Sequence, residues 1–521
     1  MYSFLKRITN TLLLALLSIS LLGTVSLFPR IVTGSNKFFV LFLLFIFALF
    51  AFFVICQNKF LFHFNFVKKF FEKSVFNTKL VSHFGVCSIV FLLLFWQYYC
   101  IKNLTGWGAW DWATVAQSVL PGHEKKIEYF SFYPNNLFLL KVEHIVWILT
   151  GKPEFEAFFY YLNWFNTILI DIATVLLYLS SSMLFGKSGR KITLFLSLFS
   201  FTLLPFVVIP YTDTFSFFTV SLLIFSLLKF KQYYEIENLI KMLTIVVVIG
   251  LETAVAYMLK PSTIILPLAV LICTAVYLLF KNKKHFWRNV FLLIIFVLTF
   301  WGATSSTNSF LVNHNGLVKI EKGRSLPLTH FMAMGMKGNG SFNVKDDSSS
   351  KAIVDPKERN KKSIELIETR LKKFGFVGYL KFIVKKQQLN TADGTFGWGQ
   401  ESKFYLLVNH PNNQQEANTL PRKLFVNKEG VATDSKYNFR LVQQILWTII
   451  IILSIFGIFI KSQFDLVLKL SILGFFLFLL LFEGGRSRYV IQFLPLIILL
   501  ATQGALLLKR LSRKSIFKEY F

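Results

Sequence analysis

The sequence predicts an all-α polytopic membrane protein, on three observations. Of the 521 residues, 54% are hydrophobic and only 16% are charged, whereas a soluble chain of this length carries far more charge. Apolar runs of about 18 residues or more recur, and a helix of that length crosses the roughly 30 Å hydrocarbon core of a bilayer. The basic residues lie mostly in the short segments between these runs, where topology signals are usually found.

The formal net charge of +29 is interpreted as a membrane property. Lysine and arginine between apolar runs keep loops on the cytoplasmic side and attract anionic lipid. No RNA-binding aromatic motif and no basic arm accompanies this charge, so nucleic acid is not expected as a partner. The four cysteines lie in or beside apolar segments without CxxC spacing, so they predict neither a zinc site nor a disulfide framework.

About twelve apolar runs have the length of transmembrane helices. The first follows the residues MYSFLKR and looks like a signal peptide, but no small-x-small cleavage site follows, so we expect a retained first helix. The basic segments 186–191 and 281–288 and the basic tail indicate that both termini are cytoplasmic. The expected spans are residues 10–29, 37–56, 80–101, 157–184, 192–209, 211–228, 242–259, 262–280, 289–308, 441–460, 465–482 and 489–508.

The apolar run at 135–150 is not expected to cross the membrane. If it crossed, the basic segments before and after it could not all be cytoplasmic. Lys141, Glu143 and His144 also lie in its middle, where a charge in a span costs most. We therefore predict an amphipathic helix on the outer membrane face, within one long external loop, 102–156.

The polar segment 309–440 is too long for a simple loop and predicts an extracytoplasmic cap. It divides an N-terminal transmembrane region, 1–308, from C-terminal helices and a basic cytoplasmic tail, 441–521. Within the cap, residues 356–388 place apolar side chains at helical spacing with a basic opposite face. Two interpretations stay open for this helix, a surface helix of the cap and an interfacial helix at an anionic lipid or polymer.

Four polar segments interrupt the apolar pattern at predicted outer membrane boundaries. Charges at such depth need a partner or a ligand. Cations can bind phosphate oxygens, and a carboxylate can remove a proton from an attacking hydroxyl. The segments are GAWDWATVAQSVLPGHEKKIEYFSFYPNN (108–136), IPYTDTFSFF (209–218), YMLKPSTIILP (257–267) and LFEGGRSRYVIQFLP (481–495).

Each charged residue in these segments also has a simpler structural interpretation. Asp111 and Asp213 are placed where helix caps occur, and Lys260 and Arg488 where basic side chains reach from a span to the interface. The simpler interpretation of Glu252, which lies inside a span, is an ion pair with a neighbouring basic side chain. Aromatic rings of the first segment stack on sugars or form an interfacial belt. The gathering of all four segments on one face favours a functional site.

At these residues the chain resembles the bacterial integral-membrane glycosyltransferases of the C type, the GT-C superfamily. The resemblance includes its protein mannosyltransferase-like and aminoarabinose transferase-like branches, and it is carried by WDWATV, YFSFYPNN and EGGRSRYVIQFLP. IPYTDT, LPLTHFMAMGMKGNGSFNVKD (326–346) and ADGTFGWG (392–399) are similar to a Gram-positive group thought to act on cell-surface polysaccharides.

The resemblance implies a GT-C-like bundle with a juxtamembrane helix in the first external loop and a mixed extracellular cap. It implies a polyprenyl-phosphate-linked sugar donor and a cell-envelope acceptor, which is a polysaccharide, teichoic acid, lipid or protein. Transfer takes place on the outer face of the cell membrane, by direct displacement with a carboxylate base. A flippase or exporter, and a polymerase or ligase of lipid-linked saccharides, stay open as alternatives.

The resemblance also implies roles for single residues. Asp111 matches the catalytic loop acid, but Trp112 follows it where a second acid is common, so Glu128 or Asp213 becomes the candidate second carboxylate. No metal ligand is assigned, and a requirement for Mg or Mn stays open, since the external loops lack a DxD motif and KDDSSS does not replace one. The expected donor-phosphate residues are Lys260, Arg486, Arg488 and Tyr489, and the expected substrate-binding residues are Trp110, Tyr133, Asn135, Tyr211, Asp213 and His330.

Overall fold

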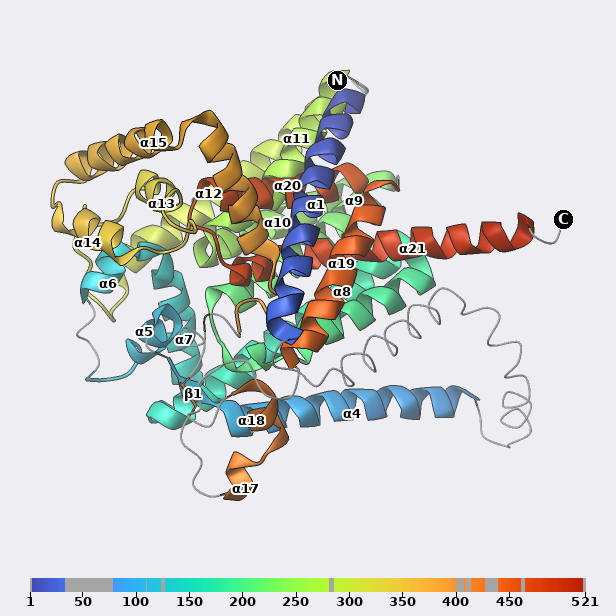
Figure 1. Ribbon diagram of the computed structural model, residues 1–521, viewed down its shortest axis with the longest axis horizontal. Coiled ribbons are helices and arrows are strands. Elements are labelled where there is room, and N and C mark those ends of the chain that lie inside the picture. Colours follow the sequence, from blue (N-terminus) through green and yellow to red (C-terminus); the bar gives the residue numbers. More distant parts are fainter. Residues whose placement is uncertain are drawn as a thin grey trace.

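The structure is a computed structural model, and it describes residues 2–32, 78–108, 110–122, 127–280, 285–398, 401, 407–408, 414–426, 439–460 and 464–518. Long helices form a bundle, and shorter elements gather at one end of it, on the left of Figure 1. The C-terminal helix α21 (Leu494–Lys518) runs toward the opposite side.

In the part of the chain that the structure describes, seven helices are long and apolar enough to cross a membrane. The protein is therefore a multi-pass membrane protein. The predicted span 37–56 lies outside the described residues, so the total of twelve spans stays a prediction. The seven helical stretches are Tyr2–Pro29, Phe155–Thr202, Thr212–Glu235, Leu239–Leu259, Phe286–His314, Phe439–Ile458 and Ser487–Leu511.

These stretches contain α1 (Tyr2–Val32), α8 (Phe155–Ser197), α9 (Thr212–Glu235), α10 (Leu239–Leu259) and α12 (Phe286–His314). Helix α19 (Phe439–Ile458) and α21 complete the set. Three further helices cover predicted spans, and they are α4 (Thr78–Leu104), α11 (Ile265–Phe280) and α20 (Asp465–Leu481).

Helix α8 is two antiparallel helices joined by a tight turn. Gly186 has φ 68°, a left-handed conformation that glycine adopts without a steric penalty. Thr193 donates a hydrogen bond of 2.7 Å to Ser181, whereas twelve residues of straight helix would separate them by about 18 Å. The chain thus turns at Gly186, the first residue of the predicted loop 186–191, whereas residues 187–191 already belong to the second arm. The second arm ends as α-helix at Ser197 and continues as a π turn to Thr202, short of the predicted 209.

The first loop contains only short helices, as predicted. Helix α7 (Leu137–Leu149) has 13 residues and is about 20 Å long, too short to cross a bilayer. It packs against α8, α10 and α12. Glu143 faces the protein interior and is fully buried, and this burial raises the pKa of its carboxyl well above the ordinary value. The other elements of the loop are β1 (Gly106–Trp107), α5 (Asp111–Gln117), α6 (Ile127–Phe132) and η1 (Pro134–Asn136).

The segment predicted as a cap reaches into the bundle. Helix α15 (Pro356–Thr391) bends at Gly375, where φ is 60°, and then packs against α1 and α20 (Figure 1). The residues after it are buried, with Phe396 and Trp398 in the main hydrophobic core. The other elements are α13 (Leu328–Met334), α14 (Val344–Ala352), α17 (Gln414–Ala417), α18 (Leu420–Phe425) and β2 (Leu407–Val408), which pairs antiparallel with β1.

A buried ion cluster holds the end of the bundle where α20 begins. Lys469 and Asp465 are both almost fully buried, and their charged atoms lie 2.6 Å apart. Lys6 of α1 lies 2.9 Å from the same carboxylate, and Gln503 of α21 donates to it at 3.0 Å. Three helices distant in sequence are thus joined at the end opposite Leu481, the last residue of α20.

Candidate active site

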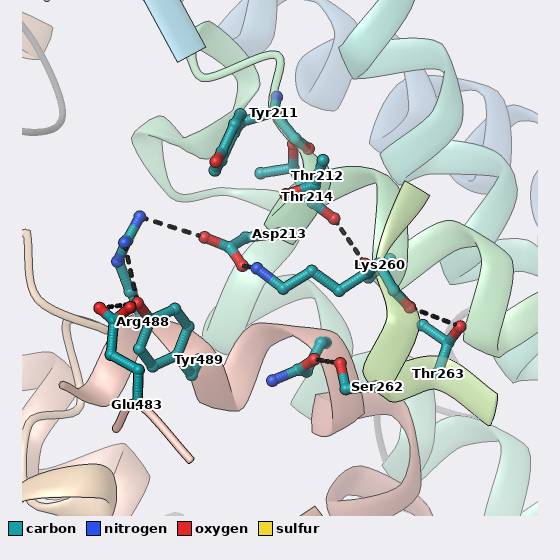
Figure 2. A network of polar contacts seen from close by, with 12 residues as sticks. Tyr211, Thr212, Asp213, Thr214, Lys260, Ser262, Thr263, Glu483, Arg488 and Tyr489 are labelled. Atoms are coloured by element: carbon teal, nitrogen blue, oxygen red, sulfur yellow. Dashed lines mark hydrogen bonds and ion pairs between the residues drawn. The ribbon is translucent and has the colours of Figure 1, made fainter. Parts of the chain in front are cut away.

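Asp213 is the centre of a charged network at the start of α9. The turn before it is held by Thr214, whose hydroxyl accepts from the backbone N–H of Tyr211 at 3.2 Å and donates to the carbonyl of Ile209 at 2.8 Å. Asp213 is therefore not needed as the helix cap. Its carboxylate oxygens lie 2.5 Å from Nζ of Lys260 and 3.5 Å from Nη1 of Arg488 (Figure 2).

Lys260 reaches Asp213 because α10 ends one residue before it. Pro261 cannot continue the hydrogen-bond ladder of α10, and it opens the short 3-10 helix η4 (Pro261–Ile264). The backbone of Lys260 is extended, with φ −148°, and the side chain points back toward α9. Its ammonium also lies 5.2 Å from the ring centre of Tyr489 and 5.9 Å from that of Tyr211, so it is not an interfacial anchor.

Arg488 extends the network to a carboxylate that the sequence did not single out. It lies on η5 (Ser487–Phe493), and its Nε is 3.4 Å from Glu401 Oε2. Arg486 lies 3.5 Å from the same oxygen. Burial raises the pKa of the Glu401 carboxyl, although Arg488 and Arg486 act in the opposite direction.

Tyr489 connects this network to Glu483. Nη2 of Arg488 donates to the Tyr489 hydroxyl at 3.1 Å, and that hydroxyl donates to Glu483 at 2.8 Å (Figure 2). Asp213 therefore lies between Lys260 and Arg488, and Glu401 lies between Arg488 and Arg486. Glu483 is joined to the network through the Tyr489 hydroxyl. Three cations face three carboxylates, so an incoming anion has to share or replace existing ion pairs.

The EGGR turn places these arginines. Gly485 has φ 70°, and a Cβ there would overlap the carbonyl oxygen of Asn339 in the cap. Its N–H donates to Asn390 at 2.5 Å. Lys386 of α15 donates to the carbonyls of Gly335 and Phe482, both at 2.6 Å, and so joins the cap to the end of α20.

Asp111 is held by a hydrogen-bond chain in the first loop. It lies in the first turn of α5, where Trp110 occupies the cap position, so it is not the helix cap. The Tyr129 hydroxyl donates to Asp111 Oδ1 at 3.0 Å, and Asn136 donates to that hydroxyl at 2.6 Å. Burial, and then the charge of Asp111, raises the pKa of Tyr129, which keeps the proton on the phenol. Among the described residues, no hydrogen bond reaches Asp111 Oδ2.

The charges of Asp111 and of the Asp213 network both affect Tyr211. Burial raises the pKa of Tyr211 well above its ordinary value, and the next largest cause is the charge of Asp111. Arg488 lowers this pKa and Asp213 raises it further.

The cap contributes a second pair of acids beside the first loop. Tyr133 donates a hydrogen bond of 2.5 Å to Asp347 of α14, and Lys351 lies 2.7 Å from the same side chain. Asp346 is bound by Lys337 at 2.7 Å and by Arg370 at 2.8 Å. These acids belong to KDDSSS, which the sequence analysis considered only as a metal motif.

The structure brings together most of the expected site residues. The network above contains Asp213, Lys260, Arg486, Arg488, Tyr489 and Tyr211. Asp111 and Tyr133 belong to the hydrogen bonds of the first loop, to Tyr129 and to Asp347. Glu128 is exposed on α6, and Trp110 is exposed and meets the edge of Phe342 at 6.3 Å. Asn135 donates to Asn136 at 3.4 Å, and His330 is buried in the cap, where burial lowers its pKa. Glu252 accepts from Ser226 at 2.8 Å rather than pairing with a base.

Sequence reasoning missed four contributors. Glu401 lies outside the quoted motifs, whereas Asn136 and Asp347 lie in YFSFYPNN and KDDSSS but were not singled out there. Tyr129 was considered only as a ring for stacking, although its hydroxyl makes the decisive contact. Among the described residues no three His, Cys, Asp or Glu side chains gather as metal ligands would.

Residues 1–506 match a family model described as "Conserved hypothetical integral membrane protein". No curated protein matches the chain. Among solved structures, the archaeal oligosaccharyltransferase AglB from Archaeoglobus fulgidus, in complex with an inhibitory peptide and a dolichol-phosphate, is similar at 13% identity and a TM-score of 0.41. The match covers 83% of this chain and 52% of that one, so the chain spans about half the length of AglB.

The other similar structures are of ArnT from Cupriavidus metallidurans. The apo state matches at 11% identity and a TM-score of 0.33, over 82% of this chain and 78% of that one. The state bound to undecaprenyl phosphate matches at 12% identity and a TM-score of 0.31, over 81% and 77%.

Proposed function

The chain belongs to the family of conserved hypothetical integral membrane proteins, and we propose that it catalyses glycosyl transfer at the outer face of the cell membrane. The donor is a sugar linked to polyprenyl phosphate. The acceptor is a hydroxyl of a cell-envelope polysaccharide, teichoic acid, lipid or protein.

One observation carries this proposal. The cations Lys260 and Arg488 meet at Asp213 beside the ring of Tyr211, and Asp111 of the first loop has an oxygen that no described residue binds. A base together with a phosphate-binding group suits a substrate in which a sugar lies between an attacking hydroxyl and a phosphate.

The reaction is a direct displacement. The acceptor hydroxyl gives its proton to Asp111 while its oxygen forms a bond to the anomeric carbon of the donor. The bond from that carbon to the phosphate oxygen breaks, and the electron pair leaves with polyprenyl phosphate. Lys260, Arg486 and Arg488 stabilise the negative charge that develops on this leaving group.

The ion pairs around Arg488 prepare the site for an anion. Burial raises the pKa of Glu401, so protonation of this carboxyl costs less than it does in water. Protonated Glu401 no longer neutralises Arg486 and Arg488, so a phosphate oxygen can take its place beside them. Asp213 stays between Lys260 and Arg488 and keeps the two cations at a fixed separation.

The test is transfer of radiolabelled sugar from a polyprenyl-phosphate donor in membranes that contain the protein. Asp111→Asn should abolish transfer while donor binding and folding persist, because the amide cannot accept the proton. Glu154→Gln is the matched control, an exposed carboxylate near the end of the same loop. Full activity of the Asp111 variant rejects the base assignment. Movement of labelled donor across the bilayer without transfer would instead indicate a flippase.

A further inference from the structure

Helix α15 carries an exposed apolar face after its bend. Phe376 and Val377 are 81% and 61% exposed, and Leu380 and Val384 continue the same face one and two turns later. A monomeric soluble surface rarely leaves such side chains together in water. This face therefore meets something apolar.

Lysines flank the same face. Lys372 and Lys373 precede the bend, and Lys381 and Lys385 are exposed beside the apolar residues. Apolar side chains bordered by cations are typical of helices that lie in the interface of a bilayer with anionic lipid. Helices in the hydrocarbon core rarely carry so many exposed charges.

The depth of this segment is fixed by its own contacts. Lys386 follows it at once and donates to the carbonyls of Leu480 and Phe482, at 3.0 and 2.6 Å, where α20 ends. Gln387 donates to Ser20 of the spanning helix α1 at 3.1 Å. The segment thus lies against α1 and beside the end of the apolar helix α20, where the bilayer changes from acyl chains to headgroups.

We propose that Phe376–Lys385 is an interfacial anchor that inserts Phe376, Val377, Leu380 and Val384 into the leaflet at this end of the bundle. Its lysines bind the phosphates of anionic phospholipids. Gly375, with φ 60°, allows the helix to leave the cap and turn toward the bundle beside α1 (Figure 1). Because α15 also holds the EGGR turn through Lys386, the anchor fixes the height of the cap over the membrane.

The full-length protein in lipid nanodiscs tests this anchor. With the four native cysteines replaced, an environment-sensitive fluorophore is attached at Phe376→Cys or, as a control upstream of the bend, at the exposed Glu368→Cys. Bromine-bearing lipids should quench the label at 376 at least about twofold more than the label at 368. A second label at Leu380→Cys should behave like that at 376. Equal, weak quenching at all three positions overturns the proposal.

Lipid selectivity is tested in the same nanodiscs. Bromines on phosphatidylglycerol should quench the label at 376 more than bromines on phosphatidylcholine, by about twofold or more. Replacing Lys372, Lys373, Lys381 and Lys385 by Gln should remove this preference. The matched control replaces Lys345, Lys357, Lys361 and Lys362, which are exposed before the bend, and should keep it.

Three outcomes would overturn the anchor. One is equal quenching by the two lipids, and another is loss of the preference in the control variant, which would indicate diffuse attraction by the whole cap. The third is a label at 376 that stays in water and is shielded only when polyglycerol phosphate is added, which would indicate an anionic polymer instead of a membrane.

Discussion

The phenol of Tyr129 donates a hydrogen bond of 3.0 Å to Oδ1 of Asp111. The bond crosses from α6 to α5 and orients the carboxylate that we propose as the base. Asn136 donates a hydrogen bond to the Tyr129 hydroxyl and holds it in place. The conformation of the first loop therefore sets the orientation of the Asp111 carboxylate.

Tyr129→Phe should therefore lower the rate of transfer while the protein stays folded. A hydrogen bond to a charged group contributes about 1.5–3 kcal/mol, so a loss of about 10- to 100-fold is expected. Initial rates at saturating donor measure it. Tyr161→Phe, at an exposed position of α8, should retain full activity, and an equal loss there would remove the special role of Tyr129.

The pair of Lys260 and Asp213 should behave as one unit in stability. Lys260→Met leaves Asp213 buried with one cation fewer, and breaking a buried pair costs about 3 kcal/mol or more. The double variant with Asp213→Asn should be less destabilised than the sum of the single ones, measured by thermal unfolding in detergent. Lys231→Met breaks the solvent-accessible pair with Glu235 and should cost less than about 1 kcal/mol. Strict additivity of the two buried changes would contradict the coupling.

Gly485→Ala should damage the site more than a comparable glycine change elsewhere. Gly485 and Gly316 have nearly the same φ, 70° and 72°, so alanine is strained by about 1–2 kcal/mol at either. Only at 485 does a new Cβ meet the carbonyl of Asn339, whereas nothing lies within 4 Å of one at 316. We expect weaker donor binding for Gly485→Ala alone. Similar binding by both variants would mean that the EGGR turn does not place the arginines.

Docking of α14 onto α15 should weaken in acid. Burial opposes the charge of Asp346, but hydrogen bonds from Arg370 and Lys337 outweigh it, and the pKa is lowered. A carboxyl whose pKa is lower in the folded than in the unfolded protein stabilises the fold at pH values above its unfolded pKa, about 3.9. This stabilisation is lost as the pH falls through the folded pKa. Limited proteolysis of the cap from pH 6 to 3 measures the effect. Asp346→Asn should be cleaved readily at both ends of this range, and an unchanged pH dependence would contradict the assignment.

The helices of the bundle were largely predictable because the length of an apolar run is set by the thickness of a bilayer. The turn at Gly186 and the non-spanning α7 followed from where charge falls, since a charge in mid-span is costly. The charged residues of the site were found for the same reason. Their partners were not, because Asp213 and Lys260 are 47 residues apart and only packing of α9 beside α10 makes them neighbours.

The sequence by itself determined that the protein crosses a membrane many times and that Asp111, Asp213, Lys260 and Arg488 stand at membrane boundaries. Hydropathy and charge are local properties, so they can be read along the chain. Only the tertiary structure decided that Tyr129 holds Asp111, that Glu401 joins Arg486 to Arg488, and that Lys260 pairs with Asp213. Those relations depend on side-chain directions from helices distant in sequence, and packing alone fixes such directions.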